Sequence, residues 1–286
     1  MRKKYGIIAA GAATAGLLAW NIIDTHRLTV SRYEIVSEKI RGRLKAVLVS
    51  DLHDTSFGRE NKRLKERIDR LSPDIILSAG DMITSEKRSG NRAGQEFMEN
   101  LARKYPVYAV EGNHENKMQD HPERFPSFSE KMYMTSLRIG GIRFPYDEPG
   151  MVWDSGIYVS ALKMPVRYDR KFNRKRPDPE ELKLMCPRPV EGAYNILLAH
   201  DPLYFEEYSS LGYDLAVSGH VHGGIIRLPG LGGLLSPDFS FFPKYDSGLY
   251  AEDGFSMIVS RGLGTHTFPV RIGNPAEIVE IEFRGV

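Results

Sequence analysis

The chain of 286 residues contains one cysteine, Cys186. A single cysteine excludes an internal disulfide framework and a structural zinc site built from thiolates. An excess of charge of one sign is also missing, because 39 Lys and Arg residues stand against 37 Asp and Glu residues, which gives a formal net charge of +2. The sequence therefore offers no globally basic surface for nucleic acid, and we expect no specific nucleic-acid partner.

The N-terminus carries an uncharged apolar run, Tyr5 to Ile23, behind the basic start Arg2–Lys4. A helix of this length nearly spans a bilayer core of about 30 Å. A cleaved signal peptide is the alternative, but no clear A-x-A site follows, and Trp20 is typical of a membrane interface. We expect residues 1–25 to form a membrane anchor or signal segment. The basic start favours a single span in the cell membrane with the body outside the cytoplasm, or a secreted protein if the segment is cleaved.

Short apolar runs alternate with helical patterns from about Arg32 onward. Residues 59–72 predict a helix with one apolar side, and residues 26–43 a linker and the first strand. Later strands, beginning with residues 141–146, outnumber the helices between them. This excess predicts two packed sheets flanked by helices rather than one doubly wound sheet. Three early runs predict buried parallel strands: "LKAVLVS" (44–50), "PDIILSAG" (73–80) and "PVYAVEG" (106–112).

Polar side chains follow five of these predicted strands at their carboxyl ends, where open α/β sheets bind ligands. Five of the eight histidines are used there. The pair His220 and His222 can converge on one point, because residues i and i+2 of a strand point to the same side. Taken together, the pattern predicts a metal site rather than a set of satisfied polar groups. The ligand candidates are Asp51, His53, Asp81, Asn113, His200, His220 and His222.

The types of these side chains limit the metal. Carboxylates and imidazoles without thiolates suit Mn(II), Fe or Zn. Seven candidates are too many for one ion and about right for two, and a carboxylate can bridge two cations. Two such ions can bind phosphate oxygens and acidify a bridging water to hydroxide, which supplies a nucleophile without an activated Ser or Cys.

The order of the motifs, D-x-H, GD, GNH[DE], H and GHxH, resembles that of the calcineurin-like metallophosphoesterase superfamily. The resemblance covers about Leu44 to Phe283, so residues 44–286 are expected to form this domain, and it implies an α/β fold of the two-sheet αββα sandwich type. It implies that Asp81 bridges the two metals. His114 resembles the catalytic histidine of the family, and Glu115 either orients it or is a plain surface carboxylate. By the same resemblance, Asp51, His53, Asp81 and His222 hold the first metal, and Asp81, Asn113, His200 and His220 hold the second.

The later runs "GHVHGGIIRLP" and "VSRGLGTHTFPVRI" resemble a bacterial branch of phosphodiesterases with an N-terminal signal or anchor. Asp201 departs from the family pattern, in which a small polar residue or Asn is expected after the histidine. Arg261 and Arg271 are candidates for substrate phosphate. His266 and the charged loop 166–179 are weaker candidates for substrate contact.

The sequence therefore predicts a two-metal hydrolase of phosphodiester or pyrophosphate bonds. Its partner is a phosphate-ester substrate, lipid-linked or close to the membrane to which the N-terminal helix attaches. A phosphomonoesterase and a nuclease with the same site are alternatives, and the nuclease is disfavoured by the balanced charge. A non-catalytic interaction module of this fold is disfavoured because all seven ligand positions and His114 are present.

Overall fold

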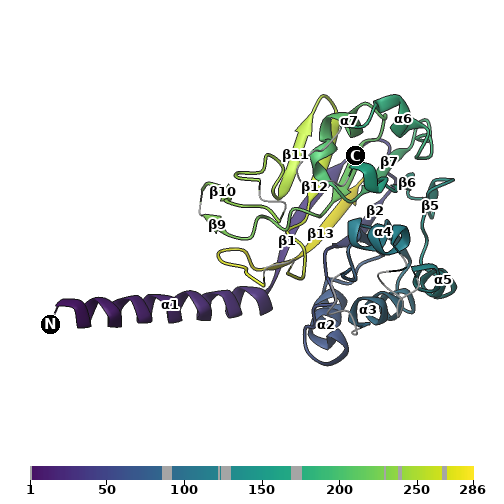
Figure 1. Cartoon of the computed structure of the whole chain (residues 1–286). Coiled ribbons are helices and arrows are strands. Elements are labelled where there is room, and N and C mark those ends of the chain that lie inside the picture. The colour runs from purple at the N-terminus through teal and green to yellow at the C-terminus, as the bar shows by residue number, and fades with distance from the viewer. Residues whose placement is uncertain are drawn as a thin grey trace.

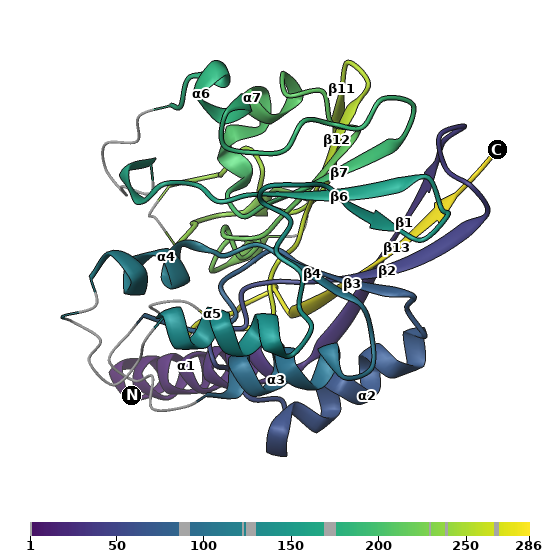
Figure 2. The same ribbon diagram turned by 90° about the vertical axis from the view of Figure 1, so that its right-hand side faces the viewer.

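Two β-sheets lie face to face at the centre of the protein, with helices on their outer sides (Figure 2). The computed structural model describes residues 2–85, 92–121, 123, 130–168, 176–228, 230–237, 240–265 and 269–286. The first sheet has the order β1 (Leu28–Val36), β13 (Ala276–Arg284), β2 (Arg43–Val49), β3 (Ile75–Ser78) and β4 (Val107–Ala109). The second has the order β11 (Gly248–Glu252), β12 (Phe255–Val259), β8 (Leu215–Ser218), β7 (Tyr194–Ala199), β6 (Ile157–Leu162) and β5 (Gly150–Val152). A short hairpin pairs β9 (Arg227–Leu228) with β10 (Gly232–Gly233).

Most neighbouring strands in the two sheets run parallel, although β13 and β2 at the centre of the first sheet are antiparallel. In the first sheet β2, β3 and β4 are parallel, and in the second β6, β7, β8 and β12 are parallel. Every residue of β3, β7 and β8 is buried, which explains their continuous apolar sequences. The parallel arrangement expected for the first three runs is confirmed.

The helices form the two outer layers. The first sheet is covered by α2 (Lys62–Leu71), α3 (Ala93–Ala102) and α5 (Glu130–Ile139), and the second by α6 (Pro179–Lys183) and α7 (Phe205–Ser209) (Figure 2). Leu64, Ile68 and Leu71 of α2 are buried, as their helical spacing predicts. The remaining elements are α4 (Asn113–Asp120) and the short 3₁₀ helices η1 (Arg59–Asn61), η3 (Val166–Tyr168) and η4 (Pro202–Tyr204).

Three apolar clusters fill the spaces between these layers. One lies between the sheets and includes Leu48, Leu77, Ile196 and Val217. The others lie between each sheet and its helices. This four-layer arrangement is the two-sheet sandwich expected from the excess of strands.

Two segments differ from the expectation. Residues 141–146 form no strand; Arg143 makes only an isolated bridge to Tyr108, and Pro145 lacks the N–H that a ladder needs. Helix α4 begins at Asn113, directly after the short strand β4, where no helix was expected.

The N-terminal segment forms α1 (Arg2–His26), which extends away from the sandwich (Figure 1). Within the described residues, no helix combines the length and the apolar character needed to cross a membrane. The expected helix is therefore present, but the expected membrane span is not supported. Residues 26–43 include β1, which pairs with β13 along its whole length.

Candidate metal centre

The polar residues that follow the strands meet at one edge, where the two sheets lie next to each other. Asp51 follows β2, Asp81 follows β3, and Asn113 is the first residue of α4 after β4. The second sheet contributes His200 after β7, and His220 and His222 after β8. The seven predicted ligands thus come from both sheets and are brought together as expected.

Five of these seven residues have a left-handed backbone, with φ between 47° and 68°. Such a conformation costs a residue with a side chain about 1–3 kcal/mol and persists where the surrounding structure enforces it. Here the left-handed residues lie two to four positions beyond the last residue of their strands, so each turn directs a polar side chain to the same edge. The five are Asp51, His53, Asp81, His220 and His222.

The first group of donor atoms belongs to Asp51, His53 and His222, which are all buried. The Nε2 atoms of His53 and His222 lie 3.0 Å apart. Asp51 Oδ1 lies 3.5 Å from His222 Nε2 and 4.0 Å from His53 Nε2. Two imidazole nitrogens and a carboxylate oxygen that face one point form a donor set suited to a first-row transition metal.

The second group belongs to Asp81, His200 and His220. Asp81 Oδ2 lies 3.3 Å from His200 Nε2, and His220 Nδ1 lies 3.2 Å from the same nitrogen. Asp81 Oδ2 also lies 3.8 Å from His53 Nε2 of the first group. Asp81 therefore stands between the two groups, in the position expected of a bridging carboxylate.

The amide of Asn113 provides a test of whether the site fits a cation. Its Oδ1 atom faces His220 Nδ1 at 3.0 Å, His200 Nε2 at 3.1 Å and Asp81 Oδ2 at 2.9 Å. The amide oxygen and the two imidazole nitrogens can each offer a lone pair to one cation at this point. The donor set fits a metal ion in this place.

Burial and charge strongly perturb the carboxylates. Burial raises the pKa of Asp51 to about 6. Burial also acts to raise the pKa of Asp81, but His200 and His114 outweigh it and hold that pKa well below 3.8. For His200, burial opposes the charged form, whereas the Asp81 carboxylate raises its pKa to about 10. A metal cation bound here would take the place of the protons that the raised pKa values of Asp51 and His200 favour.

The glycines beside the carboxylates permit a close approach of the backbone. A Cβ atom on Gly219 would lie 2.2 Å from Asp51 Oδ2, and one on Gly112 would lie 2.1 Å from Asp81 Oδ1. Both distances are far below van der Waals contact. Any larger residue in place of Gly219 or Gly112 would therefore collide with a carboxylate of the metal centre.

The family profile described as calcineurin-like phosphoesterase matches residues 44–224. The chain belongs to this family. It is 25% identical to the metallophosphoesterase YkuE of Bacillus subtilis (strain 168), over 97% of the chain and 94% of that protein. It is 24% identical to the phosphodiesterase YaeI of Escherichia coli (strain K12), over 73% of the chain and 70% of that protein. Among solved structures, the NAD nucleotidase of Haemophilus influenzae aligns with 78% of the chain and 46% of its own length, at 15% identity and a TM-score of 0.42.

His114 of this phosphoesterase lies in the first turn of α4, beside the metal ligands. Its ring contacts that of His53 edge to face, with centroids 4.6 Å apart. Its backbone N–H donates to Asp81 Oδ1 at 2.8 Å, and its Nδ1 atom accepts from the backbone N–H of Ser85 at 2.8 Å. The predicted catalytic histidine is thus tied to the central carboxylate and faces the site.

The structure gives Glu115 a different role from that of orienting the ring of His114. Its carboxylate is buried and accepts hydrogen bonds from the backbone N–H groups of Asp81, Met82, Ile83 and Gly112 at 2.9–3.3 Å. It therefore fixes the turn that carries Asp81. The capping pattern of a Glu at the third position of a helix was present in the sequence, but α4 itself was not expected there.

Asp201, where the chain departs from the family pattern, supports the ligand His220. Its Oδ2 atom lies 3.8 Å from His220 Nε2, while Oδ1 accepts from the backbone N–H of Leu203 at 3.0 Å and caps η4. His220 turns its other nitrogen, Nδ1, toward Asn113 and His200. A carboxylate on the far side of a ligating imidazole is a common way to orient it and increase its basicity.

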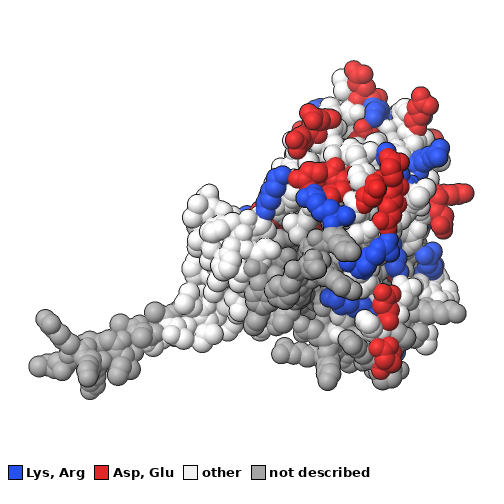
Figure 3. Space-filling model, turned by 45° about the horizontal axis from the view of Figure 1, so that its top comes forward, with Lys and Arg blue, Asp and Glu red and all other residues white. Residues whose placement is uncertain are grey.

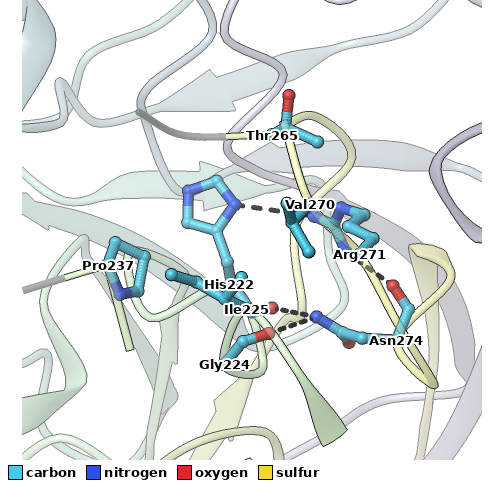
Figure 4. A pocket seen from close by; sticks show the side chains of 8 residues that line it. All are labelled: His222, Gly224, Ile225, Pro237, Thr265, Val270, Arg271 and Asn274. Carbon is cyan, nitrogen blue, oxygen red and sulfur yellow. Dashed lines mark hydrogen bonds between the residues drawn. The ribbon is translucent and has the colours of Figure 1, made fainter. Parts of the chain in front are cut away.

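The two arginines expected to bind substrate are engaged by the protein itself. Arg261 forms an ion pair with Glu277 at 2.8 Å. Arg271 is only 2% exposed, and its guanidinium donates to the backbone carbonyls of Gly264, Asn274 and their neighbours. Burial lowers the pKa of Arg271 to about 10. Arg271 Nη2 lies 3.5 Å from His222 Nδ1 (Figure 4), whereas the other ring nitrogen of His222, Nε2, faces Asp51 and His53, so Arg271 contacts the ring on the side away from these donors.

His266 and residues 169–175 of the charged loop lie outside the described residues.

Proposed function

We propose that the chain hydrolyses phosphodiester or pyrophosphate bonds with two metal ions, of the class of Mn(II), Fe or Zn. The observation that carries the proposal is the convergence of Asp51, Asp81, Asn113 and four histidines on two adjoining points, with His114 beside them. When bound, the two ions supply the positive charge that attracts phosphate oxygens and lowers the pKa of a water molecule.

The residues of the chain supply orientation and a hydrogen-bond donor. Asp81 and Asn113 hold the two points at a fixed separation, and Glu115 fixes the turn of Asp81. Because Ser85 donates to Nδ1 of His114, the neutral ring carries its proton on Nε2. This N–H is placed to donate a hydrogen bond to a phosphoryl oxygen and to stabilise the negative charge that develops on it.

A hollow beside His220 supports a substrate with an apolar part. Its walls include Leu203, Val221, Phe241 and Phe242 with His220, and its volume is about 240 Å³. Phe241 is 71% exposed, which is unusual for an aromatic side chain without an apolar partner to cover it. We propose that the hollow takes an apolar substituent of the ester, which fits a lipid-linked substrate.

The distribution of charge over the body of the protein also bears on the choice of substrate. In the view of Figure 3, charged side chains gather on the part of the body far from α1, whereas the part next to α1 is largely free of them. The exposed side chains of Leu17, Leu18 and Trp20 continue this apolar character along α1. A location outside the cytoplasm stays a prediction from the basic N-terminus.

Two observations favour a diester over a monoester. The relative YaeI is described as a phosphodiesterase. In addition, an apolar hollow next to a metal ligand has a use when the phosphate carries a second organic substituent. A phosphomonoesterase remains the second candidate, and the experiment below separates the two.

The test compares hydrolysis of bis-(p-nitrophenyl) phosphate and p-nitrophenyl phosphate by the full chain loaded with Mn(II). Faster cleavage of the diester, abolished by a chelator, is the expected result. Preference for the monoester would replace the diesterase by a phosphatase. Protein that binds two ions but cleaves neither ester, nor any lipid-linked diester or pyrophosphate in a panel, would contradict the proposed function.

A further inference from the structure

Two hydrogen bonds join α1 to a segment far away in the sequence. The Nδ2 atom of Asn21 donates to the carbonyl of Pro269 at 3.0 Å, and the backbone N–H of Arg271 donates to Asn21 Oδ1 at 2.6 Å. The side-chain amide of Asn21 thus pairs with a backbone carbonyl and a backbone N–H of the same segment, as the backbone of a neighbouring β-strand would. This contact fixes the backbone from which the side chain of Arg271 extends.

The guanidinium of Arg271 holds the turn that follows β12. Its Nε and Nη2 atoms donate to the carbonyl of Gly264 at 2.9 and 2.5 Å, and Nη2 also lies 2.9 Å from the carbonyl of Arg261 and 3.1 Å from that of Gly262. A Lys side chain has one nitrogen and cannot bind these carbonyls in the same forked way.

The carbonyl of Gly264 connects Arg271 to the metal ligand His222. It lies 3.3 Å from His222 Nδ1, and Arg271 Nη2 lies 3.5 Å from the same nitrogen (Figure 4). A neutral imidazole that binds a metal ion through Nε2 carries its proton on Nδ1, and the carbonyl of Gly264 is the acceptor within reach of that N–H. The lone pair of His222 is then on Nε2, the atom that faces Asp51 and His53.

The same segment also holds the backbone of the ligand turn. The Nδ2 atom of Asn274 donates to the carbonyls of His222 and Gly224 at 2.6 and 2.5 Å (Figure 4). A chain of contacts therefore runs from Asn21 through Arg271 to the ring of His222, and through Arg271 and Asn274 to its backbone.

We propose that Arg271 is a positioning residue that fixes the ring and tautomer of His222 for the first metal ion, and that Asn21 makes α1 part of this support. The position of α1 then sets the affinity of the first site, while the second site, which lacks these contacts, is unaffected. This inference rests on the proposed function only in requiring that the chain binds two ions.

The experiment measures metal binding by the full chain without any substrate. Metal-free protein is titrated with Mn(II), bound metal is counted after equilibrium dialysis, and electron paramagnetic resonance distinguishes a coupled pair of ions from a single ion. The variants are Arg271→Lys and Asn21→Ala. Leu18→Ala, on the exposed side of the same helix, is the matched control.

We expect Arg271→Lys to weaken one of the two binding steps about 10- to 100-fold, as is usual for residues that orient a ligating histidine. The spectrum at intermediate Mn(II) should then show a single ion in place of the coupled pair. Asn21→Ala should weaken the same step to a smaller extent, and Leu18→Ala should match the wild type. In the double variant, Asn21→Ala should add little, because its effect passes through Arg271.

Wild-type affinity at both sites in Asn21→Ala would overturn the role of α1, and equal weakening of both sites would show a general loosening instead of a specific support. If Arg271→Lys does not fold, Asn21→Ala carries the test alone. If the proposed hydrolase activity is wrong, the wild type would bind two ions without turning over any ester. That result is distinct from a change in metal affinity in the variants.

Discussion

The Nδ1 atom of His114 accepts a hydrogen bond from the backbone N–H of Ser85 at 2.8 Å. A backbone amide always donates, so this contact fixes the tautomer of the neutral ring with the proton on Nε2. The hydroxyl of Ser85 lies 3.0 Å from the same nitrogen. The chain thus prepares His114 as a hydrogen-bond donor before substrate binds.

Replacement of His114 by Ala should separate catalysis from metal binding. The ring is not needed for the contacts among Asp51, Asp81 and their histidines, so the variant should keep both ions. Loss of one hydrogen-bond donor to the transition state typically lowers the rate about 10²- to 10³-fold. The measurements are kcat for the preferred ester and metal content after dialysis, and loss of metal together with activity would contradict the division of roles.

Asp81→Asn should impair metal binding and activity together. The substitution keeps the size of the side chain but removes the negative charge that lies between His53 and His200. Both binding steps should weaken, because the carboxylate faces both groups of donors. Metal counting at increasing Mn(II) checks this, and a variant that weakens only one step would show that Asp81 does not bridge.

The ligands of the metal centre were predictable from the sequence because each one directly follows an apolar run that forms a strand. Parallel strands bring their carboxyl ends to one edge, so Asp51, Asp81 and the histidines had to meet. The two sheets also followed from the number of strands. These features depend on local sequence and on general rules of sheet topology.

The supporting residues were not predictable in this way. Arg271 was a candidate for binding phosphate, with ordinary loop packing as the alternative, because an Arg in a loop near a predicted site has no local signal that separates a substrate contact from a buried support. Its role follows from contacts with Gly264 and Asn21, the latter 250 positions away in the chain. Glu115 was misassigned because the start of α4 was not recognised.

Asp201→Asn should weaken the second metal site without affecting the first. The carboxylate of Asp201 lies 3.8 Å from His220 Nε2, and its charge increases the basicity of that imidazole. Loss of such a partner typically costs about 10- to 100-fold in metal affinity. Asn keeps the cap of η4, so the fold should be unchanged, and Mn(II) titration with a circular dichroism control checks both statements. Unchanged affinity at both steps would leave Asp201 with its capping role alone.

Phe241→Ala should lower the preference for esters with long apolar substituents. The side chain forms a wall of the hollow beside His220 but none of the contacts among the metal ligands. We expect kcat/KM to fall for a phosphodiester with a long alkyl chain and to stay unchanged for one with a methyl group. Leu184→Ala, an 89% exposed residue of a different surface, is the control. Equal losses on both esters would remove the apolar subsite from the proposal.

Glu206 provides a test of stability against pH at a place remote from the metal ligands. It forms ion pairs with Arg176 and with Lys244, the latter at 2.9 Å. Burial opposes its ionisation, but Lys244 and Arg176 outweigh this and lower the pKa of Glu206 from 4.5 to about 2. A carboxyl group whose pKa is lower in the folded state stabilises the fold above its unfolded pKa.

The stabilisation by Glu206 is therefore fully present at neutral pH and is lost as the pH falls from about 4.5 to about 2. Because Glu206 is 46% exposed, solvent screens the pairs, and the effect should be modest. Glu206→Gln should lower the thermal midpoint at pH 7, and the difference from the wild type should shrink progressively below pH 4.5, with both proteins metal-free. A difference that stays constant down to pH 2 would show that Glu206 acts through packing and neutral hydrogen bonds, such as the one from Tyr245, rather than through its charge.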